Sequence, residues 1–266
     1  MKICLLGSTG FLGKHILKKL SKNFSVSKIN LRNMPDYGGI NYKNFLNKFN
    51  KFDVIINSAA SLLPKNQRDF FINEDFPKIL CDHLKRNKKK TKLIHISTIN
   101  TLINDRKDSY SISKKKSENK LINSQVTIIR LPLIFNKKNK NIQNSGNLSI
   151  FFKYLEMNLP FYFMIYPGHI YQPVQVDSLM NFIVKVILNK NNHFKIYNIS
   201  GKYKKSLWDL FNEIAASKKK LCLKINFKKI NIFFPYFLKE FLKKKNGLLQ
   251  QFISIDNTKY KHKTVI

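Results

Sequence analysis

A chain of 266 residues, of which 43% are hydrophobic, can bury the core of one large α/β domain, or of such a domain with a small appendage. Its net charge is +34, but only five of its 49 basic residues are arginines, and the lysines are spread along the chain among many Asn and Ile. Because arginine is favoured for bidentate contacts to phosphates and bases, this excess indicates a compositional bias and argues against a nucleic-acid-binding protein. A general attraction for anionic substrates remains.

No apolar run is long enough to cross a membrane, and the first strand begins at Lys2, so we expect neither a membrane span nor a signal peptide. The three cysteines, Cys4, Cys81 and Cys222, show no metal-binding spacing and form no even set. Free thiols fit a reducing compartment. We therefore expect a cytoplasmic protein that binds no metal.

The chain opens with a short apolar strand, residues 2–6, that runs directly into a loop of the form GxxGxxG. The loop holds Gly7, Gly10 and Gly13, and the pattern of residues 11–21 predicts a helix after it. Gly7 permits a tight turn, Gly10 lets the backbone approach a ligand, and Gly13 lets the helix pack closely on the strand. A strand, such a loop and a helix N-terminus together present backbone N–H groups to the pyrophosphate of a dinucleotide.

Strands and helices alternate along the rest of the chain. Strands are predicted near 26–31, 53–57, 92–97, 126–131 and 195–199, and helices near 67–87, 110–123, 148–158, 177–189 and 206–217. This alternation predicts an α/β fold with a Rossmann-type doubly wound parallel sheet. Residues 137–147, which are rich in Lys, Asn and Gly, are expected to form a loop beside the substrate site.

The end of the second predicted strand bears on the choice between NADP and NAD. An acidic residue about 20 residues after the glycines would bond the ribose 2′-hydroxyl of NAD, whereas an arginine accommodates the 2′-phosphate of NADP. The chain has Arg32 at this point and no acid, which favours NADP. Asp36 lies close enough to compete if the loop folds back, so NAD stays open.

A second group of polar residues follows the fourth predicted strand. Ser97 and Thr98 end that strand, and Tyr110 and Lys114 come after them at i, i+4 spacing, which places both side chains on one helix face. Ligands meet an open parallel sheet at such strand ends. A nearby ammonium lowers the pKa of a phenol, so Tyr110 could serve as a general acid or base near neutral pH.

With these motifs in this order, the chain resembles the extended branch of the short-chain dehydrogenase/reductase superfamily, the NAD-dependent epimerase/dehydratase family. Further segments are similar to family elements in the expected order: residues 53–60 (DVIINSAA), Asn73, residues 129–132 (IRLP), residues 173–177 (PVQVD) and residues 197–201 (YNISG). Phe135 and Asn136 replace the usual Tyr-Gly of the family. The resemblance covers roughly residues 1–217 and fades beyond them.

The resemblance implies a Thr–Tyr–Lys site. Tyr110 would exchange a proton with the substrate oxygen, Lys114 would hold the nicotinamide ribose, and Thr98, in preference to Ser97, would hydrogen-bond the same substrate oxygen. The positions implied to bind the cofactor are Gly7, Thr9, Gly10, Phe11, Leu12, Gly13, Arg32, Ser58, Ala59, Ala60, Lys114 and Leu131.

The activity implied by the resemblance is NAD(P)-dependent hydride transfer on a nucleotide-activated sugar, by a 4-keto-sugar reductase or an epimerase of surface-polysaccharide biosynthesis. Dehydratase relatives carry two acids after the strand-end threonine, where this chain has Ile99 and Asn100, so a dehydratase is not expected. The alternative from another class is a non-catalytic dinucleotide-binding sensor or assembly protein on the same fold. Such proteins usually lose the Tyr–Lys pair, which this chain keeps.

The expected domains are a dinucleotide-binding Rossmann domain, residues 1–135 with residues 170–200 interleaved, and a small substrate-binding lobe built mainly from residues 136–266. The aromatic, lysine-flanked tail from Lys218 onward is expected to cover the substrate pocket or, alternatively, to rest on an anionic membrane surface. A homodimer stays open.

Overall fold

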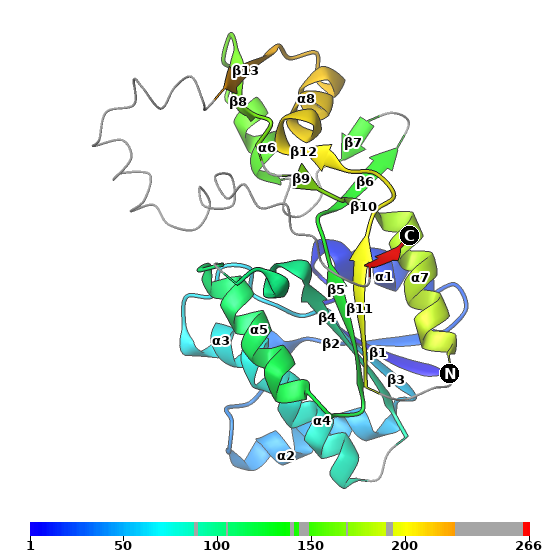
Figure 1. The fold of residues 1–266 in the computed structure, drawn as a ribbon. Coiled ribbons are helices and arrows are strands. Elements are labelled where there is room, and N and C mark those ends of the chain that lie inside the picture. The colour runs from blue at the N-terminus through cyan, green and yellow to red at the C-terminus, as the bar shows by residue number, and fades with distance from the viewer. Residues whose placement is uncertain are drawn as a thin grey trace. The chain divides into compact units, whose positions relative to one another are not determined.

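The computed structural model describes residues 1–87, 90–104, 106–138, 141–143, 149–168, 170–189, 194–226 and 263–266. The chain divides into two compact units, each assembled from two stretches of sequence (Figure 1). The first unit comprises Met1–Leu131 and Ser178–Ile199, and the second comprises Pro132–Asp177 and Ser200–Ile266.

Six strands of the first unit, together with β14 near the carboxyl end of the chain, form a seven-stranded sheet. In spatial order its strands are β14 (Lys263–Val265), β11 (Lys195–Ser200), β5 (Val126–Leu131), β4 (Lys92–Thr98), β3 (Val54–Asn57), β1 (Lys2–Leu6) and β2 (Ser25–Ile29). Every pairing from β11 to β2 is parallel, which confirms the predicted doubly wound parallel sheet. The strand order reverses beside β1, with β2 on one side and β3 on the other, and ligands bind open α/β sheets at such switch points.

Helices cover both faces of this sheet (Figure 1). On one face lie α1 (Phe11–Leu20) and α7 (Val176–Leu188), and on the other α2 (Ile40–Asn47), α3 (Gln67–Glu74), α4 (Phe76–Arg86) and α5 (Ser109–Leu121). Lys19 Nζ of α1 donates to Asn181 Oδ1 of α7 over 2.8 Å. Short 3-10 turns, η1 (Leu31–Asn33), η2 (Lys48–Lys51) and η3 (Ile99–Leu102), follow β2, α2 and β4.

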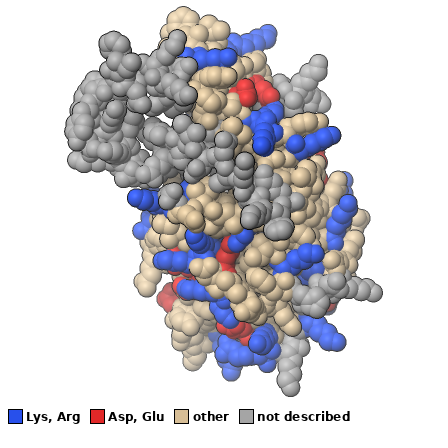
Figure 2. All heavy atoms as spheres, viewed as in Figure 1, with Lys and Arg blue, Asp and Glu red and all other residues tan. Residues whose placement is uncertain are grey.

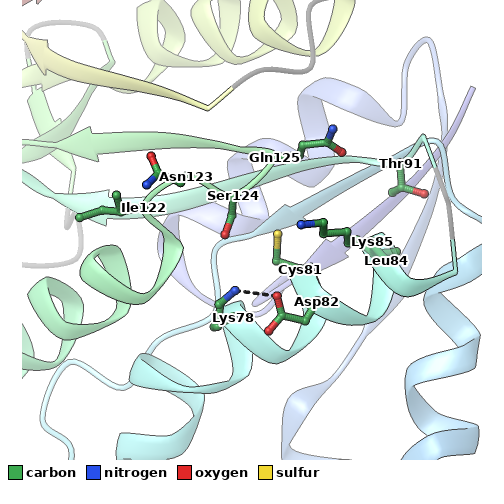
Figure 3. A pocket seen from close by; sticks show the side chains of 10 residues that line it. All are labelled: Lys78, Cys81, Asp82, Leu84, Lys85, Thr91, Ile122, Asn123, Ser124 and Gln125. Atoms are coloured by element: carbon green, nitrogen blue, oxygen red, sulfur yellow. Dashed lines mark hydrogen bonds and ion pairs between the residues drawn. The ribbon is translucent and has the colours of Figure 1, made fainter.

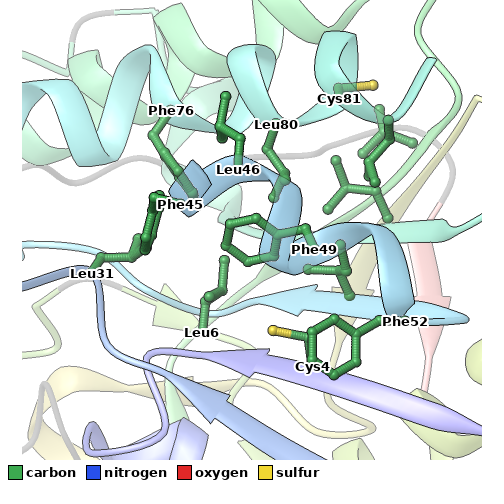
Figure 4. Close-up of a cluster of buried hydrophobic side chains, with 14 of the residues drawn as sticks. Cys4, Leu6, Leu31, Phe45, Leu46, Phe49, Phe52, Phe76, Leu80 and Cys81 are labelled. Atoms are coloured by element: carbon green, nitrogen blue, oxygen red, sulfur yellow. The ribbon is translucent and has the colours of Figure 1, made fainter. Parts of the chain in front are cut away.

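The core on the α2 and α4 side of the sheet is built around aromatic rings (Figure 4). Phe45, Phe49 and Phe76 contact one another with ring centroids 5.5 to 6.5 Å apart. Cys4 and Leu6 of β1 are fully buried in the same cluster. Burial raises the pKa of the Cys4 thiol to about 12, so this cysteine is a packing residue and not a reactive thiolate.

Among its described residues the second unit contains three small sheets and two helices. Its elements are β6 (Ile134–Lys138), β7 (Asn141–Gln143), α6 (Ser149–Leu155), β8 (Tyr162–Tyr166), β9 (Ile170–Tyr171), β10 (Val174–Gln175), β12 (Lys205–Ser206), α8 (Leu207–Ser217) and β13 (Cys222–Asn226). Phe151, Tyr162 and Phe211 pack in one buried cluster between α6, β8 and α8. A capping box of Ser206 and Asp209 starts α8, close to the helix predicted at 206–217.

Two local departures from the predicted elements have clear physical causes. The single helix expected at 67–87 is two helices, because Pro77 in the first turn of α4 has no N–H to continue the ladder of α3. The second strand ends at Ile29, not near 31, because the Asn30 side chain accepts the Arg32 N–H and starts the 3-10 turn η1.

Other differences concern segments read as irregular or not assigned. The loop predicted at 137–147 includes part of the β6–β7 hairpin, and residues 144–148 lie outside the described residues. Helix α2 was not expected. In the tail from Lys218 onward, β13 forms a parallel pair with β8, and residues 227–262 lie outside the described residues, so the fate of the aromatic segment stays a prediction. Among the residues described, no helix has the length and hydropathy needed to cross a membrane.

Candidate active site

The glycine-rich loop between β1 and α1 is closed by backbone approaches that leave no room for side chains. Gly7 has φ +78°, and a Cβ there would lie 2.6 Å from the backbone nitrogen of Ala59. Gly13 is buried, and a Cβ on it would lie 2.0 Å from the Gly7 carbonyl oxygen. A Cβ on Gly10 would meet only that same oxygen, at an ordinary 3.5 Å. Gly7 and Gly13 therefore hold the loop together, while Gly10 leaves its backbone open to a ligand.

The N-terminus of α1 carries nothing that would compete with an anion. Gly10 is the N-cap residue, no side chain caps the first turn, and no acidic residue lies in it. Thr9 and Gly10 are exposed, and Phe11 and Leu12 are partly exposed. Uncapped N–H groups at the positive end of a helix dipole suit a phosphate. These residues fit the pyrophosphate of a dinucleotide.

The loop after β3 lies against the glycine-rich loop. Ser58 is fastened to the end of β1, since both its backbone N–H and its Oγ donate to the Leu6 carbonyl, over 3.2 and 2.6 Å. Ala59 approaches Gly7 most closely, and both Ala59 and its neighbour Ala60 offer only backbone groups and methyls to a ligand. The Ser58 hydroxyl proton is thus committed to the protein.

The turn that carries Arg32 is fixed from two sides. Asn30 Oδ1 accepts the Arg32 N–H over 3.0 Å, and Arg68 Nη2 of α3 donates to the Arg32 carbonyl over 2.9 Å and also to the Met34 carbonyl. The Arg32 side chain is exposed and has no ion pair within the described part of the chain, Asp36 included. Sequence reasoning missed Arg68, because nothing in its local pattern links α3 to the end of β2.

Tyr110 and Lys114 both lie on α5, as their spacing predicted. Asp108 caps this helix: its Oδ1 accepts the Ser111 N–H over 2.9 Å, and its Oδ2 accepts Arg106 Nε over 2.6 Å. Tyr110 is partly exposed, whereas Lys114 is only 1% exposed. The Lys114 ammonium position therefore faces the interior of the first unit.

The Lys114 side chain contacts a row of buried polar side chains. Its Nζ lies 3.1 Å from Nε2 of His95 on β4, and Nδ1 of the same ring lies 3.3 Å from Asn57 Nδ2 at the end of β3. Asn57 Oδ1 in turn accepts the Ala59 N–H over 3.2 Å. The sequence analysis did not single out His95, although a histidine between Ile94 and Ile96 in a buried strand is an available signal.

The pKa values of Lys114 and Tyr110 are shifted in opposite directions from their usual values. Burial lowers the pKa of Lys114 to about 7, with the Glu118 carboxylate opposing the shift. Burial raises the pKa of Tyr110, and the carboxylates of Asp108 and Glu118 add to this. Burial and the two carboxylates thus act against the lowered Tyr110 pKa that the i, i+4 spacing suggested, and the role of Tyr110 stays a prediction.

Thr98 and Leu131 are register partners at the carboxyl ends of β4 and β5. Thr98 is 8% exposed, and its Oγ1 accepts the Asn100 N–H over 3.2 Å, so its hydroxyl proton stays available to a ligand. Ser97 is 3% exposed, and its Oγ has no hydrogen-bond partner in the described part of the chain. Ser97 also shares the strand face of His95, by the alternation of side chains.

Two side-chain networks fix α5 against its neighbours. Arg130 of β5 binds the Glu118 carboxylate, with 2.6 Å between Nη2 and Oε2, and donates to Asn198 Oδ1 of β11 over 3.2 Å. Asn73 of α3 accepts the Ser61 N–H over 2.9 Å and donates to Ser113 Oγ over 3.1 Å. Asn73, which the resemblance singled out, thus joins α3, α5 and the loop after β3.

In the part of the chain that the structure describes, charged side chains are scattered on the face shown in Figure 2, and a cavity lies away from the residues above. On the face shown in Figure 2, Lys and Arg are scattered among uncharged side chains and some Asp and Glu, not gathered in one patch. A cavity of about 280 Å³ lies between α4 and the amino ends of β4 and β5, at the sheet edge opposite Thr98; Figure 3 shows Cys81, Thr91 and Gln125 among its lining residues. The described residues contain no group of three or more potential metal ligands.

Comparison with known proteins gives matches at the level of structure alone. No protein-family model matches the sequence, and no curated protein is a significant match to it. Among solved structures, dTDP-4-dehydrorhamnose reductase from Bacillus anthracis in complex with NADP is 16% identical, with TM-score 0.66 over 86% of this chain and 85% of that one. UDP-glucuronic acid 4-epimerase from Bacillus cereus in complex with NAD is 20% identical, with TM-score 0.61 over 85% of each chain.

A third reaction occurs on the same fold. dTDP-glucose 4,6-dehydratase from Bacillus anthracis in complex with NAD is 17% identical, with TM-score 0.64 over 85% of this chain and 84% of that one. Reductase, epimerase and dehydratase thus resemble this chain about equally, and the fold does not choose between them. The chain has the fold of these three enzymes, which confirms the fold that its motifs predicted.

Proposed function

We propose that this protein is an NAD(P)-dependent oxidoreductase of nucleotide-activated sugars, and in the first place a 4-keto-sugar reductase. The supporting observation is the shared carboxyl edge of parallel β1, β3 and β4, where Gly7, Ser58 and Thr98 follow or end the strands, together with the contact of Lys114 on α5 with His95 of β4. We assign dinucleotide binding to the first unit and sugar binding to the second. A cytoplasmic location and a role in surface-polysaccharide synthesis follow by analogy with the structural neighbours.

The glycine-rich loop and the α1 N-terminus would hold the pyrophosphate of the cofactor, with Thr9, Phe11 and Leu12 around it. A nicotinamide dinucleotide, when bound, supplies or accepts the hydride at the reacting sugar carbon. Ala59, Ala60 and Leu131 would line its path along the sheet edge. The exposed Arg32, which has no ion pair with any residue that the structure describes, favours the 2′-phosphate of NADP, and NAD remains the expectation if the enzyme is an epimerase.

Tyr110 would act as the acid that protonates the substrate oxygen. The Tyr110 phenol, whose pKa is raised by burial, is protonated at neutral pH and would donate this proton to a carbonyl oxygen as the carbon is reduced. Thr98 would donate its hydroxyl proton to the same substrate oxygen, and Lys114 would hold the nicotinamide ribose.

The test is turnover of NADPH with a dTDP-linked 4-keto-6-deoxy sugar, followed by chromatography of the nucleotide sugar. A reductase consumes NADPH and forms a 4-hydroxy sugar in equal amounts, and Thr98→Val lowers kcat more than the matched control Ser97→Ala. Interconversion of two nucleotide sugars without net NADPH consumption would identify an epimerase. No reaction with any 4-keto sugar or nucleotide hexose would overturn the proposal.

A non-catalytic dinucleotide-binding protein is the second candidate, because the structure turns Lys114 into the interior, with 1% of its surface exposed. Tyr110→Phe separates the two functions. A sensor variant would keep both dinucleotide affinity and every dinucleotide-dependent response, whereas an enzyme variant would keep binding and lose turnover.

A further inference from the structure

The contact between Lys114 and His95 is part of a chain of hydrogen bonds. The donor and the acceptor in each of these bonds can be assigned by starting from the Ala59 N–H at one end of the chain. Asn57, His95 and Lys114 are 1%, 0% and 1% exposed, and they come from β3, β4 and α5. All three belong to the first unit. Since these side chains are closed off from solvent, each polar atom in the chain must be matched by its neighbour as donor or acceptor.

The backbone of Ala59 sets the direction. Its N–H can only donate, so the atom of Asn57 that faces it over 3.2 Å is the amide oxygen. The amide nitrogen then faces Nδ1 of His95 over 3.3 Å and donates to it, so Nδ1 is an acceptor. A neutral imidazole with Nδ1 unprotonated carries its proton on Nε2.

The last link reaches Lys114. Nε2–H of His95 points at Lys114 Nζ over 3.1 Å, and a lysine nitrogen accepts a hydrogen bond only when it is an uncharged amine. An ammonium at this position would need an acceptor at Nε2, hence a proton on Nδ1 facing the Asn57 amide hydrogens. Rotating the Asn57 amide to relieve that clash would turn its NH₂ group toward the Ala59 N–H, which loses a buried hydrogen bond.

The charged groups around Lys114 do not change the conclusion that its nitrogen accepts this hydrogen bond as an uncharged amine. Glu118, one turn further along α5, is held by Arg130 over 2.6 Å, and Glu74 of α3 is paired with Lys116 over 3.6 Å. β4 contributes the uncharged His95, and η3 contributes no ionisable residue. Burial shifts the pKa of His95 well below its usual value and that of Lys114 to about 7, both toward the neutral forms.

We propose that His95, oriented by Asn57, is a positioning residue that donates its Nε2–H to Lys114 and holds this lysine as an uncharged amine in the ligand-free protein. Its bearing on catalysis rests on the proposed function: Lys114 would then carry no fixed charge beside Tyr110 and would take up a proton only when the site around it changes. The structural claim itself needs no turnover and no cofactor.

The test is NMR of the ligand-free protein with ¹³Cε-labelled lysine and ¹⁵N-labelled histidine over a pH titration. We expect one lysine signal, absent from Lys114→Met and retained in Lys92→Met, to titrate near neutral pH and well below the other lysines. Lys92 is the matched control because it is also buried but donates to backbone carbonyls. The ring ¹⁵N shifts of the signal lost in His95→Gln are expected to report a proton on Nε2.

His95→Gln sharpens the test, since a glutamine carbonyl can accept from an ammonium, and the Lys114 midpoint is expected to rise toward that of ordinary lysines. A Lys114 signal that titrates with the other lysines in the wild-type protein, or a His95 proton on Nδ1, would overturn the proposal. If His95→Gln does not fold, the wild-type tautomer and the Lys114→Met comparison decide alone. Failure to bind a dinucleotide would overturn the proposed function and leave this assignment intact.

Discussion

The two halves of the candidate site in the first unit are built by different means. The half around Gly7, Gly10 and Gly13 is made of backbone, and at Gly7 and Gly13 the clearances allow only glycine. The half around α5 and β4 is made of side chains, and Lys114 and Glu118 of α5 contact His95 of β4 and Arg130 of β5. The first half follows from a local motif, whereas the second depends on residues brought together by the fold. Its chemistry therefore depends on burial as much as on the motif.

The largest loss of stability is expected when the buried ion pair between Arg130 and Glu118, in the side-chain half, is removed. Arg130→Met leaves the Glu118 carboxylate, 5% exposed, without its cation, and we expect a loss of about 3–5 kcal/mol in the free energy of unfolding by chemical denaturation. Lys120→Met, which breaks the exposed pair with Asp75, is the control, with an expected cost of about 0–1 kcal/mol. Equal costs for the two variants would contradict the assigned role of Arg130.

Removing the hydroxyl of Tyr110, in the side-chain half, tests its role in the reaction separately from its role in binding. Tyr110→Phe is expected to lower kcat by about 100-fold or more, the usual contribution of a general acid, without weakening NADPH binding. Steady-state kinetics and a binding titration of the same preparation measure both quantities. Unchanged turnover would exclude Tyr110 as the proton donor.

Substitutions of two glycines in the backbone half are expected to have different effects, one on stability and the other on dinucleotide binding. Gly13→Ala forces a Cβ to within 2.0 Å of the Gly7 oxygen, and overpacking of this kind costs about 1–3 kcal/mol of stability. Gly10→Ala meets only a 3.5 Å contact, so it should fold normally and lose dinucleotide affinity. Thermal unfolding and NADPH titration measure the two effects. Full NADPH affinity in Gly10→Ala would place the phosphates elsewhere.

The lowered pKa of Lys114 predicts a dependence of stability on pH. Between about pH 7 and the ordinary lysine value of 10.5 the unfolded chain binds this proton and the folded chain does not. Stability should therefore rise with pH across this window, by up to about 1.4 kcal/mol per pH unit from this one group. Urea unfolding at several pH values measures the slope. Lys114→Met should remove it, and a slope that survives in this variant has another origin.

The smallest expected effect concerns Arg68, which holds the Arg32 turn through two backbone carbonyls. Arg68→Gln should lower the preference for NADPH over NADH by about tenfold, or about 1.4 kcal/mol, by loosening the turn. Arg86→Gln, on α4 and outside these contacts, is the control for loss of one positive charge. A change of the same size in the control would indicate a general electrostatic effect.

The sequence predicted the backbone half of this site well and the side-chain half only in outline. A strand, three glycines and a helix are contiguous, so the geometry of the loop could be predicted from the local sequence. The i, i+4 spacing placed Tyr110 and Lys114 on one helix correctly. It carried no information about burial, which acts to raise the pKa of Tyr110 in the folded protein.

What could not be predicted depends on contacts between distant residues. Arg68 reaches the turn of Arg32 across 36 residues, and His95 meets Lys114 across 19. The break between α3 and α4 was readable at Pro77, and the β8–β13 pairing was not, since neither strand carries a local signal for its partner. Local sequence patterns thus predict the helices and strands, whereas the chemical properties of their side chains depend on burial and on residues distant in the sequence.

The central claim is that the first unit binds a nicotinamide dinucleotide at the glycine-rich loop. The most direct measurement is the dinucleotide content of the purified protein, followed by calorimetric titration with NADPH and NADH. An empty protein that binds NADPH more tightly than NADH, and loses this binding in Gly10→Ala, is the predicted result. Tightly retained NAD would contradict the reductase assignment, and binding of neither dinucleotide would contradict the central claim.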